Sequence, residues 1–161
     1  MPSEMEVSFP GDDAMKILSF IALAFVISLA VAAPSHPAGD PKPEMAGQNY
    51  AQGEEKARQG EWAEAAALFR KVIEEDDQHY KALNMLGYSL RKMGKAKEAI
   101  AAYNKALSIK PDYAPALEYR GVAHVMAGNK AAALADMQKL KSLGSPLAED
   151  LGEKIAAMPA N

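Results

Sequence analysis

The chain of 161 residues contains no cysteine, which excludes disulfide bonds, thiolate chemistry and a lipid anchor on a cysteine. It has only three histidines, His36, His79 and His124, and no two of them have the spacing of metal ligands. The acidic run 74–77 lacks the alternating spacing of a calcium-binding loop. The motifs G-x-S-x-G, H-E-x-x-H and the P-loop are also missing. We therefore expect no enzyme, no cofactor and no metal site.

An excess of charge of one sign is missing as well. Residues 1–32 contain four acids and one base, so that 17 acids and 17 bases remain from Ala33 onwards. A neutral surface offers no electrostatic footprint for nucleic acid or for anionic lipid. We expect the partner to be a protein or a peptide and not a nucleic acid.

One segment of the chain is long and apolar. Residues 17–33 carry no charge, follow Met15-Lys16 and contain Ala30-Val31-Ala32, which fits the small-x-small cleavage pattern of a secretory signal peptide. Residues 1–14 carry acids and no base, unlike the basic start of a signal. The sequence predicts a start-site extension over 1–14, a signal peptide over 15–32 and an exported, periplasmic protein cleaved near Ala32/Ala33. If cleavage does not occur, the same apolar segment is at the lower limit for a membrane anchor.

The segments that flank the central part of the chain have their own signatures. Residues 34–44 contain four prolines and a glycine, which predicts an extended linker over 33–45. Ser145-Pro146 opens a last helical segment, which has one apolar stripe and polar residues on its other sides. This predicts a capping helix and tail over 146–161. The apolar stripe consists of Leu147, Leu151 and Ile155.

Between the two flanking segments the chain repeats itself every 34 residues. Each unit has two apolar stripes with helical spacing, separated by a glycine of the kind found at helix C-termini. The matching columns are Gly53/Gly87/Gly121, Gly60/Gly94/Gly128, Ala65/Ala99/Ala133 and Phe69/Tyr103/Met137. The repeat predicts three helix-turn-helix units.

The central unit resembles a tetratricopeptide repeat (TPR). The family pattern W-x₂-L-G-x₂-Y, A-x₃-F, P appears here as Leu83-x₂-Leu86-Gly87-x₂-Leu90, Ala99-x₃-Tyr103 and Pro111. The outer units depart from the pattern at Asn49, Gln52 and Lys56 in the first and at Arg120, His124 and Met137 in the third. The resemblance implies an all-α fold. It is a right-handed α-solenoid of three TPR-like units over 46–145 (46–79, 80–113 and 114–145), with a C-terminal capping helix.

The resemblance also implies a protein interaction module whose first helices line a concave face. A polar stripe displaced from the leucines of the central unit gives the expected partner-binding residues, together with the corresponding places of the other units. They are Tyr50, Glu54, Lys81, Asn84, Tyr88, Arg91, Glu118, Val122 and Val125. A solvated helix face without a partner is the alternative. Trp62, the only tryptophan, is expected to pack in the core.

The family's clamp for a C-terminal carboxylate uses a lysine and an asparagine on the first unit's inner helix. Tyr50 and Glu54 occupy these places, so no such clamp is expected. The prediction is an exported TPR-type module that binds a peptide or protein partner in the cell envelope. The alternative is a membrane-anchored assembly scaffold with the apolar segment uncleaved. Three units are near the minimum for a solenoid, so self-association through an exposed end is compatible with this prediction.

Overall fold

The computed structural model describes residues 42–159, and our expectations for the start-site extension and the signal peptide lie outside this range. The described residues form helices and no strand, which confirms the prediction of an all-α fold. None of these helices combines the length and the apolarity needed to cross a membrane. The helices are α2 (Lys42–Arg58), α3 (Trp62–Glu75), α4 (Tyr80–Lys92), α5 (Ala96–Ile109), α6 (Ala114–Met126), α7 (Lys130–Ser142) and α8 (Leu147–Ala156).

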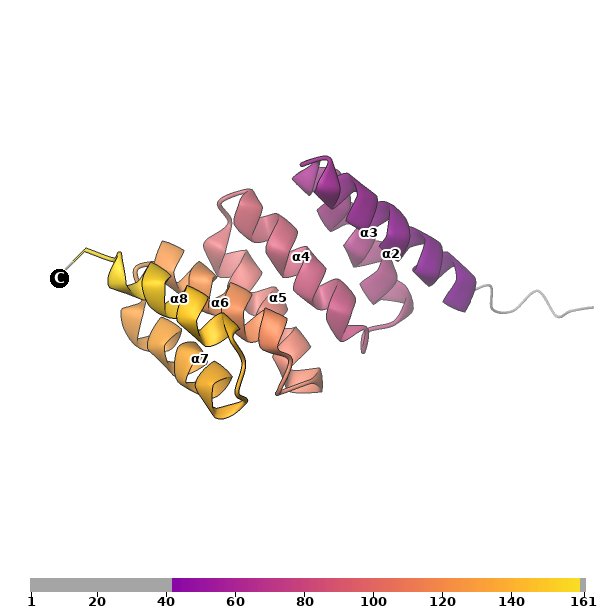
Figure 1. The fold of residues 1–161 in the computed structure, drawn as a ribbon. Coiled ribbons are helices and arrows are strands. Elements are labelled where there is room, and N and C mark those ends of the chain that lie inside the picture. The colour runs from indigo at the N-terminus through magenta and orange to yellow at the C-terminus, as the bar shows by residue number, and fades with distance from the viewer. Residues whose placement is uncertain (1–41, 160–161) are drawn as a thin grey trace, which may run out of the picture. The chain divides into compact units, whose positions relative to one another are not determined.

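Consecutive helices pack as pairs, and each pair packs against the next (Figure 1). The pairs are α2 with α3, α4 with α5 and α6 with α7, while α8 lies against both α6 and α7. Helices α4 and α6 begin at Tyr80 and Ala114, where the second and third units of the sequence repeat begin. This is the predicted α-solenoid of three helix pairs and a capping helix.

The first helices of the pairs lie closer together than the second helices. Helix α4 contacts both α2 and α6, whereas within residues 42–159 no comparable contact joins α3 to α5 or α5 to α7. The stack therefore curves toward its first helices. We call the surface formed by α2, α4 and α6 the inner face, and the surface formed by α3, α5 and α7 the outer face.

The turns inside the pairs repeat one geometry. Gly60, Gly94 and Gly128 have φ angles of 80°, 78° and 74°, a region that residues with a side chain rarely adopt. The residue after each glycine donates its N–H to the carbonyl five positions earlier, as Lys95 does to Leu90 at 3.0 Å. This bond closes the end of the first helix in the manner of a Schellman cap. The expected helix-end role of this glycine column is confirmed.

A second glycine column allows the helices to approach closely. A Cβ added to Gly53 would lie 2.8 Å from the ring of Phe69, and one added to Gly87 would lie 2.6 Å from the ring of Tyr103. The rings of Phe69 and Tyr103 are fully buried. Each ring can fill the crossing between two helices only because the facing residue has no side chain.

In the third unit, the side chain that packs against the glycine differs from the expectation. The sequence repeat places Met137 in the column of Phe69 and Tyr103, but the side chain that contacts Gly121 is Leu151 of α8. Met137 lies next to Gly152 instead. Because α8 packs against both α6 and α7, its leucine fills the space at Gly121. The capping helix thus completes the core of the third unit.

The N-terminal boundary of the solenoid also differs from the expectation. The predicted linker over 33–45 overlaps α2, because the helix begins at Lys42 and includes Pro43 in its first turn. A proline is tolerated there, since the N–H groups of the first turn have no partner within the helix. The proline-rich composition therefore led to a predicted linker that extends too far, into the first turn of α2.

One ion pair replaces an apolar contact in the third unit. Arg120 of α6 donates to both carboxylate oxygens of Asp136 on α7, at 3.1 and 2.6 Å, and also to Asn104 of α5 at 2.7 Å. The Asp136 side chain is only 4% exposed. The same positions in the central unit hold Leu86 and Ala102. The departure of the third unit from the repeat pattern at position 120 is thus explained by a compensating acid.

We predict opposite effects for two glycine-to-alanine changes in helices. Gly87→Ala places a methyl group against the buried ring of Tyr103, and overpacking of this kind costs about 1–3 kcal/mol. Gly47→Ala meets no atom within 4 Å, so it gains helix propensity of up to about 1 kcal/mol. Thermal or urea unfolding of the two variants measures this difference. A Gly87→Ala protein as stable as the wild type would contradict the close approach at this crossing.

We predict that removing only one partner of the Arg120–Asp136 ion pair lowers stability, whereas replacing both partners with apolar residues does not. Asp136→Ala leaves the Arg120 guanidinium without its carboxylate and is expected to cost about 1–3 kcal/mol. The double change Arg120→Leu with Asp136→Ala recreates the Leu86/Ala102 contact and is expected to restore stability to within about 1 kcal/mol of the wild type. Urea denaturation of the two single variants and the double variant tests this. A double variant no more stable than Asp136→Ala would show that the ion pair has a role an apolar contact cannot fill.

Candidate functional site

The inner face contains a cleft between α2 and α4. Its volume is about 450 Å³, and its walls combine apolar, aromatic and charged side chains. They are Glu54, Ala57, Arg58, Trp62, Met85 and Tyr88. The short turn after Gly60 brings Trp62, the first residue of α3, to the end of this cleft. The cleft is thus shared by the first two helix pairs.

Aromatic rings from three helices continue the cleft across the inner face. The ring of Trp62 contacts that of Tyr88 edge-on, with centroids 5.7 Å apart, and Tyr88 lies 5.2 Å from Tyr119 of α6. Beneath them the buried ring of Tyr103 lies 6.3 Å from Tyr119. Edge-on and tilted ring pairs of this kind stabilise one another beyond their buried area. The rings form a fixed aromatic surface at the middle of the solenoid.

Two cations lie on this aromatic surface. The Arg91 guanidinium carbon is 5.1 Å from the centroid of Tyr88 and 5.6 Å from that of Tyr119, and Lys92 Nζ is 5.2 Å from the Trp62 ring. All three distances are within the range of cation–π attraction. Across residues 42–159 neither cation has a carboxylate within 4.0 Å. The two positive charges are therefore held by rings and not by acids.

Arg91 is partly withdrawn from water. The side chain is half-buried, and its Nε is buried without a hydrogen-bond partner among the described residues. Next to it lies the buried hydroxyl of Tyr103. Burial raises the pKa of Tyr103, and the positive charge of Arg91 together with its side-chain hydrogen bonding to this hydroxyl partly opposes the rise. Arg91 is therefore a partly buried cation with the Tyr103 hydroxyl as its polar neighbour.

Asn84 does not face an open groove, contrary to our expectation. It is 3% exposed, and its Oδ1 has no hydrogen-bond partner in the described part of the chain. Tyr80 and Tyr88 lie one helical turn away on either side. Their rings pack against Tyr113, the residue before α6, and against Tyr119 of α6. Since successive first helices crowd together on the inner side of the curve, these rings cover Asn84.

Of the other expected residues of α2 and α4, some are accessible on the inner face and one is mainly a packing residue. Lys81 is exposed and Glu54 lines the cleft, as the expectation of an accessible face requires. Tyr50 is half-buried, with its ring 5.6 Å from Phe69 and 5.1 Å from His79. Burial, followed by the charge of Glu54, raises the pKa of the Tyr50 hydroxyl. Tyr50 therefore belongs mainly to the internal packing of the first unit.

The expected residues of α6 lie toward the capping helix. Glu118 is half-buried and 4.0 Å from Lys154 of α8. Burial raises the pKa of Glu118, and Lys154 partly opposes the rise. Val122 and Val125 are half-buried against the core, and Val125 also lines a small hollow with Lys154 and residues 157–159. The structure thus does not bring these three residues into the cleft that contains Tyr88.

Four inner-face residues were missed or misplaced by sequence reasoning. Met85 and Tyr119 are 34 positions apart and so form a repeat column of their own, beside the predicted polar column. Lys92 lies outside that predicted polar column. Trp62 was expected in the core, yet it is only half-buried and lines the cleft. The signal that could have found this site is the recurrence of large side chains at 85 and 119, one position after the polar column.

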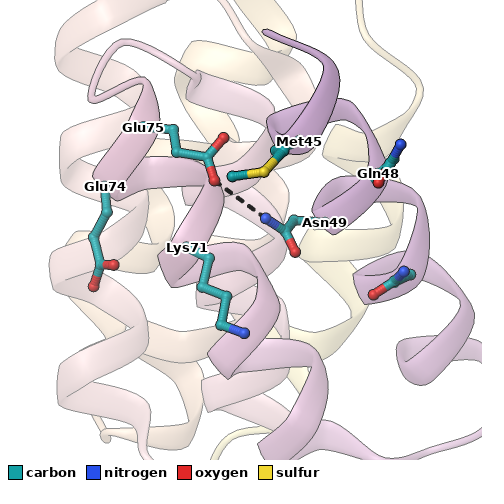
Figure 2. A pocket seen from close by; sticks show the side chains of 7 residues that line it. Met45, Gln48, Asn49, Lys71, Glu74 and Glu75 are labelled. Carbon is teal, nitrogen blue, oxygen red and sulfur yellow. Dashed lines mark hydrogen bonds between the residues drawn. The ribbon is translucent and has the colours of Figure 1, made fainter. Parts of the chain in front are cut away.

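The structure contains a second hollow at its N-terminal end, with a volume of about 380 Å³ (Figure 2). Figure 2 shows Asn49 of α2 donating to Glu75 of α3, a bond of 3.2 Å. Lys56, farther along α2, pairs with Glu61 and Glu64. Two of the polar residues that depart from the repeat pattern in the first unit, Asn49 and Lys56, are therefore bonded within that unit. They give the unit a polar outer side, typical of a solenoid end.

The outer face has a groove of about 390 Å³ between α3 and α5, and its floor is apolar. Leu83, Leu86 and Leu90 of α4 form this floor, and Arg70 and Lys105 belong to its walls. The groove lacks the aromatic rings and the ring-bound cations of the inner face. We therefore take the inner face as the candidate site.

The histidines of the described residues have structural surroundings. No group of three or more metal-ligating side chains occurs between residues 42 and 159. His124 is half-buried, and burial lowers its pKa. His79 serves as a helix cap, because its Nδ1 accepts the N–H of Ala82 at 3.0 Å.

Comparison with known proteins agrees with the fold. Residues 50–114 match the family model described as tetratricopeptide repeat. The curated proteins gave no match.

Several solved structures share the arrangement of helices. The TPR2B domain of yeast Sti1, in its complex with pHsp70, has a TM-score of 0.68 at 20% identity, over 72% of this chain and 99% of that chain. The second TPR domain of human RPAP3, with the HSP70 peptide SGPTIEEVD, has 0.67 at 20% identity, over 71% and 98%. The Yersinia enterocolitica type III secretion chaperone SycD, with a peptide of the translocator YopD, has 0.64 at 17% identity, over 71% and 89%. At these identities the likeness establishes the fold. Residues 50–114 thus match the tetratricopeptide repeat pattern, and they lie within a solenoid that has the fold of tetratricopeptide repeat domains.

Proposed function

We propose that the protein binds a segment of another protein on the inner face of its solenoid, without covalent chemistry. The cleft between α2 and α4 carries this proposal, because it combines apolar walls with a few fixed polar groups. Tyrosine, tryptophan and arginine are also the residues that most often dominate the energy of protein interfaces. Here one of each, Tyr88, Trp62 and Arg91, lies within one connected set of contacts.

The structures with the same fold support a peptide as the partner. Those of yeast Sti1, human RPAP3 and SycD were each determined with a peptide or a protein partner. In this chain, the residues proposed to contact the partner are those of the inner face that are exposed or half-buried. They are Tyr50, Glu54, Lys81, Tyr88, Arg91, Glu118, Val122 and Val125 from the sequence, together with Trp62, Met85, Lys92 and Tyr119 from the structure.

The proposed location is the periplasm, after export and cleavage near Ala32/Ala33. The support for it is the uncharged segment 17–33 with its basic start and small cleavage residues. In the alternative, the uncleaved segment holds the repeats at a membrane as an assembly scaffold. The sequence is also compatible with self-association through an exposed end of the solenoid. The polar N-terminal end described above does not favour an apolar end-to-end contact as its basis.

We predict that charge reversal on the inner face abolishes partner capture. Lys81→Glu with Lys92→Glu changes two exposed residues of α4, so helicity and melting temperature are expected to stay near those of the wild type. Capture of the partner from envelope extract by the tagged full chain should fall at least tenfold, because interfaces select for charge complementarity. The measurement is a pull-down followed by quantitative mass spectrometry.

The matched control is Lys97→Glu with Lys105→Glu, which makes the same change in charge at two exposed residues of α5. This variant should capture the partner as the wild type does. Loss of capture in the α5 variant, with capture retained in the α4 variant, would refute binding on the inner face.

We predict that the native protein begins near Ala33. Signal peptidase cleaves after small-x-small patterns, and Ala30-Val31-Ala32 is such a pattern. Intact-mass and N-terminal peptide analysis of the protein from its own cells measures this. A protein that retains residues 17–33 would instead support the membrane-anchored scaffold.

A further inference from the structure

The groove between α3 and α5 on the outer face contains apolar side chains that remain accessible. Ile73 and Leu86 are half-buried in it, and Ala101 is exposed. One unit later, the corresponding groove between α5 and α7 has a volume of about 440 Å³ and contains the ion pair of Arg120 with Asp136. A polar pair therefore fits this place in the repeat, whereas the groove between α3 and α5 is apolar.

Four exposed charged side chains surround this apolar groove. Arg70 and Glu74 lie one turn apart on α3, and Glu98 and Lys105 lie two turns apart on α5. In the described part of the chain, Arg70, Glu74 and Lys105 have no opposite charge within 4.0 Å. Glu98 lies 3.8 Å from the exposed Lys95, and such surface pairs contribute little. The four charges are therefore available to an opposing surface.

The order of the charges is opposite on the two walls of the groove. Helices α3 and α5 are the second helices of consecutive units and so run in the same direction. Along α3 the cation precedes the anion, whereas along α5 the anion precedes the cation. The groove between α5 and α7 lacks this arrangement, because the corresponding positions hold Asn104, Ser108, Ala132 and Lys139.

This arrangement of charges is complementary to itself. Two copies of one surface can meet about a twofold axis that lies either across the groove or along it. An axis across the groove places Glu98 opposite Lys105 of the second copy, and Arg70 opposite its Glu74. An axis along the groove places Arg70 opposite Glu98 of the second copy, and Glu74 opposite its Lys105. Both orientations bring opposite charges together, which is the complementarity that specific interfaces show.

We propose that the outer-face groove between α3 and α5 binds the same groove of a second copy of this chain, forming a symmetric dimer. The apolar side chains of the groove then lose contact with water, and the charges at its edges pair across the interface, as in the apolar core and polar rim of known interfaces. The cleft between α2 and α4 lies on the inner face and so stays open in both copies. Partner binding on the inner face is therefore independent of this contact.

The test measures the oligomeric state of the full chain, purified from its own cells, by analytical ultracentrifugation at concentrations up to about 1 mM, which reaches even a weak interface. The variants are Lys105→Glu alone, Lys105→Glu with Glu98→Lys, and Lys105→Glu with Glu74→Lys. The matched control is Lys139→Glu, at the position of Lys105 one unit later. The changed residues are all exposed, so melting temperatures should stay near that of the wild type.

We expect a concentration-dependent dimer for the wild type and the same dimer for Lys139→Glu. Lys105→Glu should raise the dimer Kd at least about tenfold, because the new acid faces an acid in either orientation and the twofold axis repeats this contact. One of the double variants should return to within about threefold of the wild-type Kd, because it restores the opposite charges. Rescue by Glu98→Lys indicates the axis across the groove, and rescue by Glu74→Lys indicates the axis along it. Both double variants have the net charge of the wild type, so net charge alone cannot explain rescue by only one of them.

A wild-type chain that stays monomeric up to about 1 mM would overturn the inference. Self-association that Lys105→Glu leaves unchanged would also overturn it, as would a loss that neither double variant reverses. If the purified chain is monomeric and another protein binds it in a manner lost in Lys105→Glu, the groove belongs to that partner and not to a second copy. These outcomes leave the proposed function intact, because the charge reversal at Lys81 and Lys92 tests the inner face separately.

Discussion

The structure depends on a contact in which one helix offers only backbone and its neighbour offers a large side chain. Gly53 faces Phe69, Gly87 faces Tyr103 and Gly121 faces Leu151. Because interiors are packed to crystal-like density, the absence of a Cβ sets how near the helices of a pair can come. Contacts between successive first helices then curve the stack toward the inner face.

The crowding that produces the inner face also determines its chemistry. Successive first helices contact one another, so the side chains between them must share little space. Rings satisfy this requirement by packing edge-on or tilted, as Trp62, Tyr88 and Tyr119 do. Cations can then lie on the faces of these rings. An aromatic surface with two bound cations thus arises in a chain whose residues from Ala33 onwards contain equal numbers of acids and bases.

The sequence predicts the fold well because the repeated glycines occupy positions where the backbone conformation or the close approach of two helices disfavours a side chain. The glycines at 60, 94 and 128 and those at 53 and 87 are needed for turn and crossing geometry, and nothing else substitutes for them. The candidate site is predicted less well. Exposure within a column depends on the neighbouring unit, so Asn84 is covered by tyrosines that its own helix periodicity does not reveal. Trp62 likewise reaches the cleft through a turn.

The substitution of Leu151 for the expected second-helix residue has a consequence for synthesis on the ribosome. The first two units contain both partners of their glycine contact, so each can close as soon as its own helix pair has emerged. The third unit cannot close in this way, because the side chain that packs on Gly121 is Leu151, thirty positions later in the chain and beyond the second helix of that unit. Folding of the last unit is therefore tied to translation of α8. A chain interrupted before Leu151 leaves the crossing at Gly121 unfilled.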